Sequence, residues 1–192
     1  MCHTLLQDAK LYELLFKVDL DLAAEARAVG CCYCGGVLHS ARYPRKVGDA
    51  GAPLGDNYEW RLSFCCAEEG CRRRTTPASV RFLGRKIYLG AVVVLASAML
   101  QGPIPTRMAR LSELLGISGR TLRRWQIWWA LAFARSPFWR LSRGRFARPV
   151  KDSELPHSLL TRFAGTTRDG LIATLRFLGP ITTGSARGAM AF

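Results

Sequence analysis

Four cysteines arranged in two pairs constrain the fold of this chain more than any other feature. Cys31 and Cys34 form a Cys-x2-Cys pair, Cys66 and Cys71 form a Cys-x4-Cys pair, and each pair has glycine beside a member. Two thiolates at such short spacing can face one ion from a tight turn, because glycine lets the backbone fold beneath the metal. The spacing therefore predicts two knuckles that hold a single metal ion.

The chemistry of the expected ligands favours Zn²⁺, because four thiolates in a tetrahedron suit zinc better than harder ions. Four cysteines also close the coordination shell, so we expect one structural zinc rather than a catalytic one. The chain has seven cysteines, an odd number that argues against a disulfide framework. Cys32 and Cys65 are the surplus members of two adjacent pairs. Which member of each pair binds the metal stays open; we prefer Cys31 because Cys32 lacks the x2 spacing to Cys34.

The interval between the two knuckles is typical of a hairpin. Residues 37–43 predict a short strand, and residues 44–57 form a stretch rich in Gly, Pro and Asp. Residues 58–64 alternate between apolar and polar side chains. Knuckles joined by a hairpin make a small zinc ribbon. The alternation predicts one apolar face on the second strand, with polar residues on the other face: Tyr58, Trp60, Leu62 and Phe64 against Glu59, Arg61 and Ser63.

Charge is distributed very unevenly along the chain. Lys and Arg total 28 and Asp and Glu total 14, which gives a formal net charge of +14. Residues 72–148 hold 16 of the basic side chains, 15 of them Arg, and a single acidic one, Glu113. An Arg-favouring base composition of the gene would explain Arg in place of Lys, but not the missing acids. This segment therefore predicts a polyanionic partner, most simply nucleic acid.

The stretch from residue 111 to 125 has the pattern of a helix-turn-helix unit. Leu111 and Leu115 would face inward from a first helix, and Leu122 and Trp125 from a second. Between them, Gly116 can supply the positive φ of the turn and Ser118 an N-cap. A plain helical hairpin is the alternative, which the basic outward face disfavours.

The expected nucleic-acid contacts fall in three places. Recognition helices contact base edges with residues near their N-terminus. Arginines that follow the last metal ligand, Cys71, and arginines in the basic arm can contact phosphates. The candidate DNA-binding residues are Arg72, Arg73, Arg74, Ser118, Arg120, Thr121, Arg123, Arg124, Gln126, Arg143 and Arg145.

These elements predict an α+β fold that is mostly helical, with a small ribbon followed by a helical domain. We divide the chain into N-terminal helices (1–30), ribbon (31–80), helix-turn-helix domain with basic arm (81–148) and C-terminal helices with a tail (149–192). The first part is expected to hold helices at 4–17 and 20–29, the second capped by Asp19. A buried helix is expected at 86–101, and two short helices at 153–164 and 167–178.

No segment is apolar for long enough to span a bilayer, since the longest run, residues 87–100, falls short of about 20 residues. Asp8 and Glu13 lie where the apolar part of a secretory signal would begin. We therefore expect a cytoplasmic, nucleoid-associated protein without a membrane partner.

A zinc ribbon ahead of a helix-turn-helix, with Arg-rich connections, resembles the DNA-binding region of bacterial insertion-sequence proteins, both transposases and transposition accessory proteins. The likeness covers roughly residues 31–135. It is carried by Cys31, Cys34, Cys66, Cys71 and the stretch 111–125.

Full transposases of this kind add an RNase H-like domain in which three carboxylates bind two metals. This chain departs from them, because few acidic residues follow Glu69: Glu113, Asp152, Glu154 and Asp169. The resemblance therefore implies a double-stranded DNA-binding accessory or regulatory protein of a mobile element, with a transposase or another mobile-element protein as its partner. We do not expect an enzyme. The alternatives are an RNA- or ribonucleoprotein-binding module and the DNA-binding part of a transposase or nuclease. The sequence leaves open whether the chain forms a homodimer.

Overall fold

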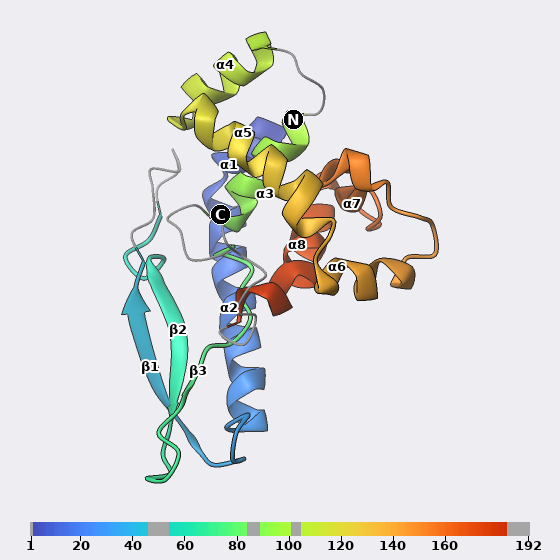
Figure 1. The fold of residues 1–192 in the computed structure, drawn as a ribbon. Helices are drawn as coiled ribbons and strands as arrows, with labels where there is room; N and C mark the ends of the chain where they lie inside the picture. Colours follow the sequence, from blue (N-terminus) through green and yellow to red (C-terminus); the bar gives the residue numbers. More distant parts are fainter. Residues whose placement is uncertain (1, 46–53, 84–88, 101–104, 184–192) are drawn as a thin grey trace.

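The protein is mostly helical and carries one small three-stranded antiparallel sheet (Figure 1), so the predicted α+β class is confirmed at this level. The structure, a computed structural model, describes residues 2–45, 54–83, 89–100 and 105–183. The helical elements are α1 (Cys2–Leu6), α2 (Ala9–Val29), α3 (Gly90–Met99), α4 (Pro105–Leu115), α5 (Gly119–Ile127), the π-helix η1 (Trp128–Phe133), α6 (Pro137–Ser142), the 3-10 turns η2 (Arg143–Arg145) and η3 (Asp152–Glu154), α7 (His157–Leu160), α8 (Thr167–Leu178) and the 3-10 turn η4 (Gly179–Thr182).

The sheet has the order β1-β2-β3, with strands β1 (Leu38–Pro44), β2 (Trp60–Cys66) and β3 (Arg74–Thr75). β1 and β2 pair from Leu38 opposite Cys66 to Pro44 opposite Trp60. The predicted hairpin is therefore present, although part of its loop, residues 46–53, lies outside the described residues. Because the register sets Leu38 beside Cys66, the hairpin carries the second knuckle back toward the first.

The predicted polarity of β2 is wrong at residues 60–63, although Tyr58 and Phe64 are buried and Glu59 is exposed as predicted. Arg61 and Ser63 are buried, whereas Trp60 and Leu62 are only partly covered. The cause is contact with distant parts of the chain, since the Arg61 guanidinium donates hydrogen bonds to the backbone carbonyls of Pro77 and Thr182. The segment after β3 and the end of the described chain thus cover the face that alternation alone assigns to solvent.

In the N-terminal part, the short α1 precedes one long helix, α2, which runs through the break predicted between residues 17 and 20. α2 begins after the N-cap Asp8, whose carboxylate accepts a hydrogen bond from the backbone N–H of Lys10, and it runs for 21 residues without a break at Asp19. Asp19 as a helix cap is therefore wrong. Its side chain lies in the middle of α2 with 1% exposure, because its carboxylate has partners elsewhere in the fold.

A buried ion pair joins α2 to the segment that leads into the helical half. The Nε of Arg81 donates to Oδ2 of Asp19 at 2.8 Å, and both side chains are fully buried. The same guanidinium donates to the carbonyls of Tyr58 (2.6 Å) and Trp60 (2.9 Å), while the backbone N–H of Val80 donates to Oδ1 of Asp19 at 2.7 Å. One charge pair therefore holds α2, the start of β2 and the chain before α3 together.

A single large hydrophobic core contains side chains from all four segments distinguished in the sequence, among them Leu15, Tyr58, Trp125 and Leu175. α3 lies at its centre, and nine of its ten residues are buried. This agrees with the buried helix predicted there, whose flanks at 84–88 and 101–104 lie outside the described residues. The predicted helix at 167–178 is α8, while the one at 153–164 is replaced by η3 and the short α7.

We expect Asp19→Ala to destabilise the fold by about 3–5 kcal/mol, because the change leaves the Arg81 charge buried without its carboxylate. Chemical denaturation followed by circular dichroism measures the loss. Asp21→Ala, an exposed position on the same helix, is the matched control and should change the free energy of unfolding by less than about 0.5 kcal/mol. Equal effects of the two substitutions would contradict this role for the ion pair.

Candidate metal centre and basic helical surface

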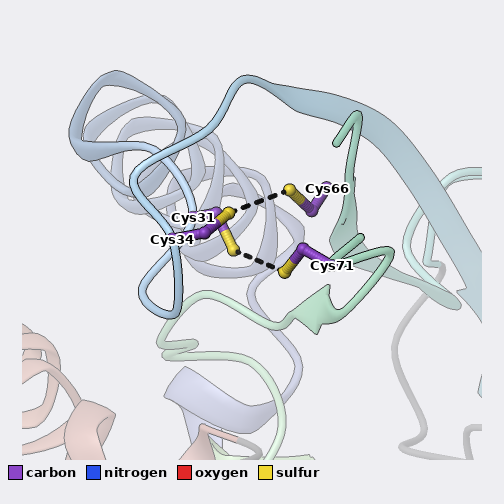
Figure 2. A group of neighbouring side chains, drawn as sticks. All are labelled: Cys31, Cys34, Cys66 and Cys71. Atoms are coloured by element: carbon purple, nitrogen blue, oxygen red, sulfur yellow. Dashed lines mark hydrogen bonds between the residues drawn. The ribbon is translucent and has the colours of Figure 1, made fainter. Parts of the chain in front are cut away.

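The four cysteines of the two predicted knuckles lie together. The Sγ atoms of Cys31, Cys34, Cys66 and Cys71 are all within 4.8 Å of one another and can hold a metal ion. Figure 2 shows the side chains of the two knuckles pointing toward one another. Across the knuckles, the Sγ atoms of Cys31 and Cys71 are 3.7 Å apart and those of Cys34 and Cys66 are 3.5 Å apart.

These two distances are close to the separation of sulfur ligands around one tetrahedral metal ion. A tetrahedral ion with metal–sulfur bonds of about 2.3 Å separates its sulfur ligands by about 3.8 Å. The donors are all soft thiol sulfurs, and in the described ranges this is the one group of Cys, His, Asp and Glu side chains close enough together to hold an ion. Four protein ligands leave no open position for a substrate, so the centre is suited to holding structure rather than to catalysis.

The backbone brings each pair of thiols into place. α2 ends at Gly30, which has a φ of +84° that directs the chain straight into the first knuckle. There the N–H of Cys31 donates to the carbonyl of Gly36 at 2.9 Å, and the N–H of Gly35 donates to Cys31 at 2.8 Å. In the second knuckle the N–H of Cys71 donates to Glu68 at 3.0 Å. Both turns are thus closed by their own hydrogen bonds.

The adjacent cysteines are oriented away from the group. Cys32 is exposed, and its Sγ lies 4.0 Å from the hydroxyl of Thr75. The thiol of Cys65 faces the carbonyl of Arg72 at 3.6 Å. Cys31 and Cys66 are buried instead. The choice that the sequence left open therefore falls on Cys31 and Cys66.

The thiols differ in acidity. Hydrogen bonding to the Tyr33 backbone lowers the pKa of Cys31 to about 7. Burial raises the pKa of Cys66 to about 12. Without metal, the Cys31 thiol therefore loses its proton more readily than the Cys66 thiol.

We expect Cys66→Ser to abolish stoichiometric metal binding and to unfold the knuckle end, because metal affinity at such a site is folding energy. Cys34→Ser should do the same. Cys65→Ser is the matched control and should keep one metal ion per chain. Elemental analysis of protein purified without chelator gives the metal content, and a wild-type chain without metal would contradict the assignment.

Metal affinity should fall as pH falls, since thiolates bind the ion and each proton taken up by a thiol opposes binding. The raised pKa of Cys66 and the lowered pKa of Cys31 mean that protons are released on binding between pH 6 and pH 8. Competition with a chromogenic chelator at several pH values measures this. An affinity that stays constant over this range would argue against thiolate ligands.

α4 and α5 form a helical hairpin at the end of the molecule opposite to the cysteines (Figure 1). Gly116 has a φ of +61° in the turn, and the hydroxyl of Ser112 donates to the carbonyl of Ile117 at 2.6 Å. The Ser118 hydroxyl caps α5 by accepting the N–H of Thr121 at 3.3 Å. The side chains that the pattern directs inward are buried: Leu111, Leu115, Ile117, Leu122 and Trp125.

The candidate contacts on α5 fall into two groups. Arg120 and Arg123 are exposed, and Arg124 is partly buried. Thr121 is buried, so its predicted outward position is wrong; its hydroxyl accepts a hydrogen bond from Ser118 instead. The amide of Gln126 is partly buried and donates to the carbonyl of Leu100 at 3.0 Å. Ser118 is exposed but serves as the cap.

The three arginines after the second knuckle are exposed but do not act as one group. Arg72 lies 3.8 Å from the carboxylate of Glu69. The guanidinium of Arg73 lies 4.6 Å from the ring centre of Tyr33, and that of Arg74 lies 5.7 Å from the ring centre of Tyr43. Each arginine therefore contacts a different side chain, and the three guanidinium groups are not arranged together to bind phosphate as expected.

The helical surface differs sharply from the knuckle end in charge. Residues 105–148 carry ten arginines and the single acid Glu113; all of these arginines except the partly buried Arg124 are exposed. Arg143 pairs with Asp152 at 3.1 Å, whereas Arg145 is exposed on the turn η2. The exposed Arg107 and Arg110 on α4 were missed from the sequence, because the helix-turn-helix pattern directs attention to the second helix.

Comparison with protein-family models, with curated proteins and with solved structures finds no match. Among the described residues, no helix combines the length and the apolar character that crossing a membrane requires.

Proposed function

We propose that this protein is a zinc-containing, sequence-specific double-stranded DNA-binding protein that contacts DNA through the α4–α5 hairpin. The observation that carries the proposal is the one-sided charge of residues 105–148, with ten arginines against one acid on a mostly exposed surface. A surface evolved only for solubility would mix both signs. A surface of exposed guanidinium groups is suited to phosphates and base edges.

The shape of the hairpin favours duplex DNA as the polyanion. The major groove is about 12 Å wide and admits one α-helix. α5 is capped by Ser118 and exposes Arg120 and Arg123 in its first turns, where recognition helices contact bases. Its other face is anchored in the core by Leu122 and Trp125. In this interpretation α4 and α5 are a helix-turn-helix unit, and Arg107 and Arg110 on α4 would contact the phosphate backbone of the DNA.

The acidic residues of the helical half support binding rather than strand cleavage. Asp152 accepts hydrogen bonds from Trp139 and Arg143, Glu154 pairs with Lys151, and Asp169 forms a capping box with Thr166. These carboxylates thus have local structural roles, and a two-metal nuclease site needs carboxylates that converge on its ions. This favours a non-enzymatic role in a mobile element, as an accessory or regulatory protein that acts beside a transposase.

The metal ion in this proposal is zinc, held by Cys31, Cys34, Cys66 and Cys71 in a ribbon built on the β1–β2 hairpin. Zinc would fix the two knuckles and contribute folding energy at the end of α2. The donor set supports zinc because all four side chains are thiols, and the two Sγ–Sγ distances across the knuckles, 3.7 Å and 3.5 Å, are near those of a tetrahedral centre. No chemistry is assigned to the metal beyond this.

Arg120→Ala should narrow the affinity gap between selected and random duplexes, because a base-reading arginine contributes about 1–3 kcal/mol of discrimination. The duplexes come from rounds of selection with the purified protein, and titrations at several salt concentrations measure both affinities. Arg73→Ala should instead leave the ratio unchanged; a phosphate contact there would lower both affinities alike and reduce the salt slope by about one.

Two outcomes would count against the proposal. A selected-to-random ratio that survives Arg120→Ala and Arg123→Ala means that α5 does not read bases. Stronger binding to structured RNA than to any selected duplex would favour the ribonucleoprotein alternative.

A further inference from the structure

The knuckle end of the molecule exposes several apolar side chains within a short stretch. Val29 is 81% exposed, Val37 is 66% exposed and Tyr33 is 54% exposed. They lie within nine residues of one another along the chain. Clustered apolar exposure of this kind marks a surface that another molecule covers.

The fold brings these residues to one place. The N–H of Cys31 donates to Gly36 at 2.9 Å, so the chain segments that carry Val29 and Val37 run side by side. Tyr33 lies in the same knuckle turn, under the guanidinium of Arg73. The N-terminus of α2 and the α4–α5 hairpin lie at the opposite end (Figure 1). We call Val29, Tyr33, Val37 and the charged residues around them the tip patch.

Charge separates this patch from the rest of the surface. The exposed charged side chains of the tip patch have both signs: Glu25, Glu68 and Glu69 against Arg27, Arg72 and Arg73. A bound ion with four thiolates would add further negative charge. The helical surface is almost wholly basic, so a second copy of this chain, with its net charge of +14, is repelled there. In the tip patch, exposed apolar side chains lie beside charges of both signs, so repulsion between two copies is weaker there than on the basic helical surface.

We infer that the tip patch is a homodimer interface, in which two copies pack their tip patches against each other about a two-fold axis. A two-fold contact uses the same patch on both copies, so each needs apolar area and charges of both signs. The tip patch has both: Val29 and Val37 supply the apolar centre, and carboxylates of one copy can face guanidinium groups of the other. Nucleic acid fits this patch less well than the helical surface, because three exposed carboxylates lie among the arginines here, whereas one acid, Glu113, lies among the ten arginines there.

The test is sedimentation equilibrium of the full metal-loaded chain, kept reduced so that the exposed Cys32 does not cross-link. We expect a reversible dimer. The double variant Val29→Glu/Val37→Glu should raise the dimer dissociation constant at least tenfold, because it places four carboxylates in the two-fold contact. Leu141→Glu is the matched control, since Leu141 is 82% exposed on the helical half, and it should leave the constant within twofold.

A second variant guards against misfolding of the knuckle. Glu68→Arg/Glu69→Arg changes exposed side chains and makes the tip patch basic, so it too should weaken the dimer, more strongly at low salt. Metal content and thermal unfolding report whether each variant keeps its fold.

Several results would overturn the inference. These are a wild-type chain that stays monomeric up to about 100 µM, a dimer that both double variants leave unchanged, and a dimer that Leu141→Glu weakens equally. Titration with a random-sequence 24-base-pair duplex, a length of about two helical turns, gives a further outcome. If the tip-patch variants lose DNA affinity while the wild type is monomeric, the patch contacts nucleic acid instead. The inference does not depend on DNA binding, and a dimer that binds no duplex would overturn the proposed function alone.

Discussion

The ion pair between Asp19 and Arg81 is the contact on which the arrangement of the molecule depends. Its guanidinium reaches a carboxylate on α2 and the carbonyls of Tyr58 and Trp60, and it stacks over the ring of Phe16 at 4.7 Å. A buried pair of this kind contributes little net free energy compared with an apolar substitute, but it is expensive to break on one side. Its main effect is therefore to fix the positions at which the β-hairpin and the helical half pack against α2.

The length of α2 sets the distance between the cysteine group and the basic α4–α5 hairpin. α2 has 21 residues and is therefore about 31 Å long. The cysteine group follows its C-terminus, while the basic hairpin lies toward its N-terminus (Figure 1). About the length of α2 thus separates the cysteine group from the α4–α5 hairpin. A metal ion held by the four cysteines would order the knuckle end, where the exposed side chains are apolar or carry charges of both signs.

The features that the sequence predicts well are local. The cysteine spacing places Cys31 and Cys34 in one turn and Cys66 and Cys71 in another, and a hairpin of the right length brings the turns together. The turn at Gly116 and its cap Ser118 depend on neighbouring residues as well. The failures come from contacts across the chain. Asp19 resembles a cap in its local sequence, but Arg81, 62 positions later, takes its carboxylate; Arg61 resembles a surface residue until Pro77 and Thr182 cover it. Thr121 lies on the buried side of α5, and its hydroxyl accepts a hydrogen bond from the cap Ser118.

The π-helix η1 continues α5 directly. As a result, the two helices of the α4–α5 hairpin are anchored to the core to different extents. Trp128, Trp129 and Phe133 stack on one another, and Phe133 lies 5.2 Å from the ring of Trp139. α5 is therefore rooted in an aromatic cluster, whereas α4 buries two side chains, Leu111 and Leu115. Local opening follows the number of buried contacts. α4 is thus the helix of the hairpin that opens locally with less cost, while α5 is held against the core.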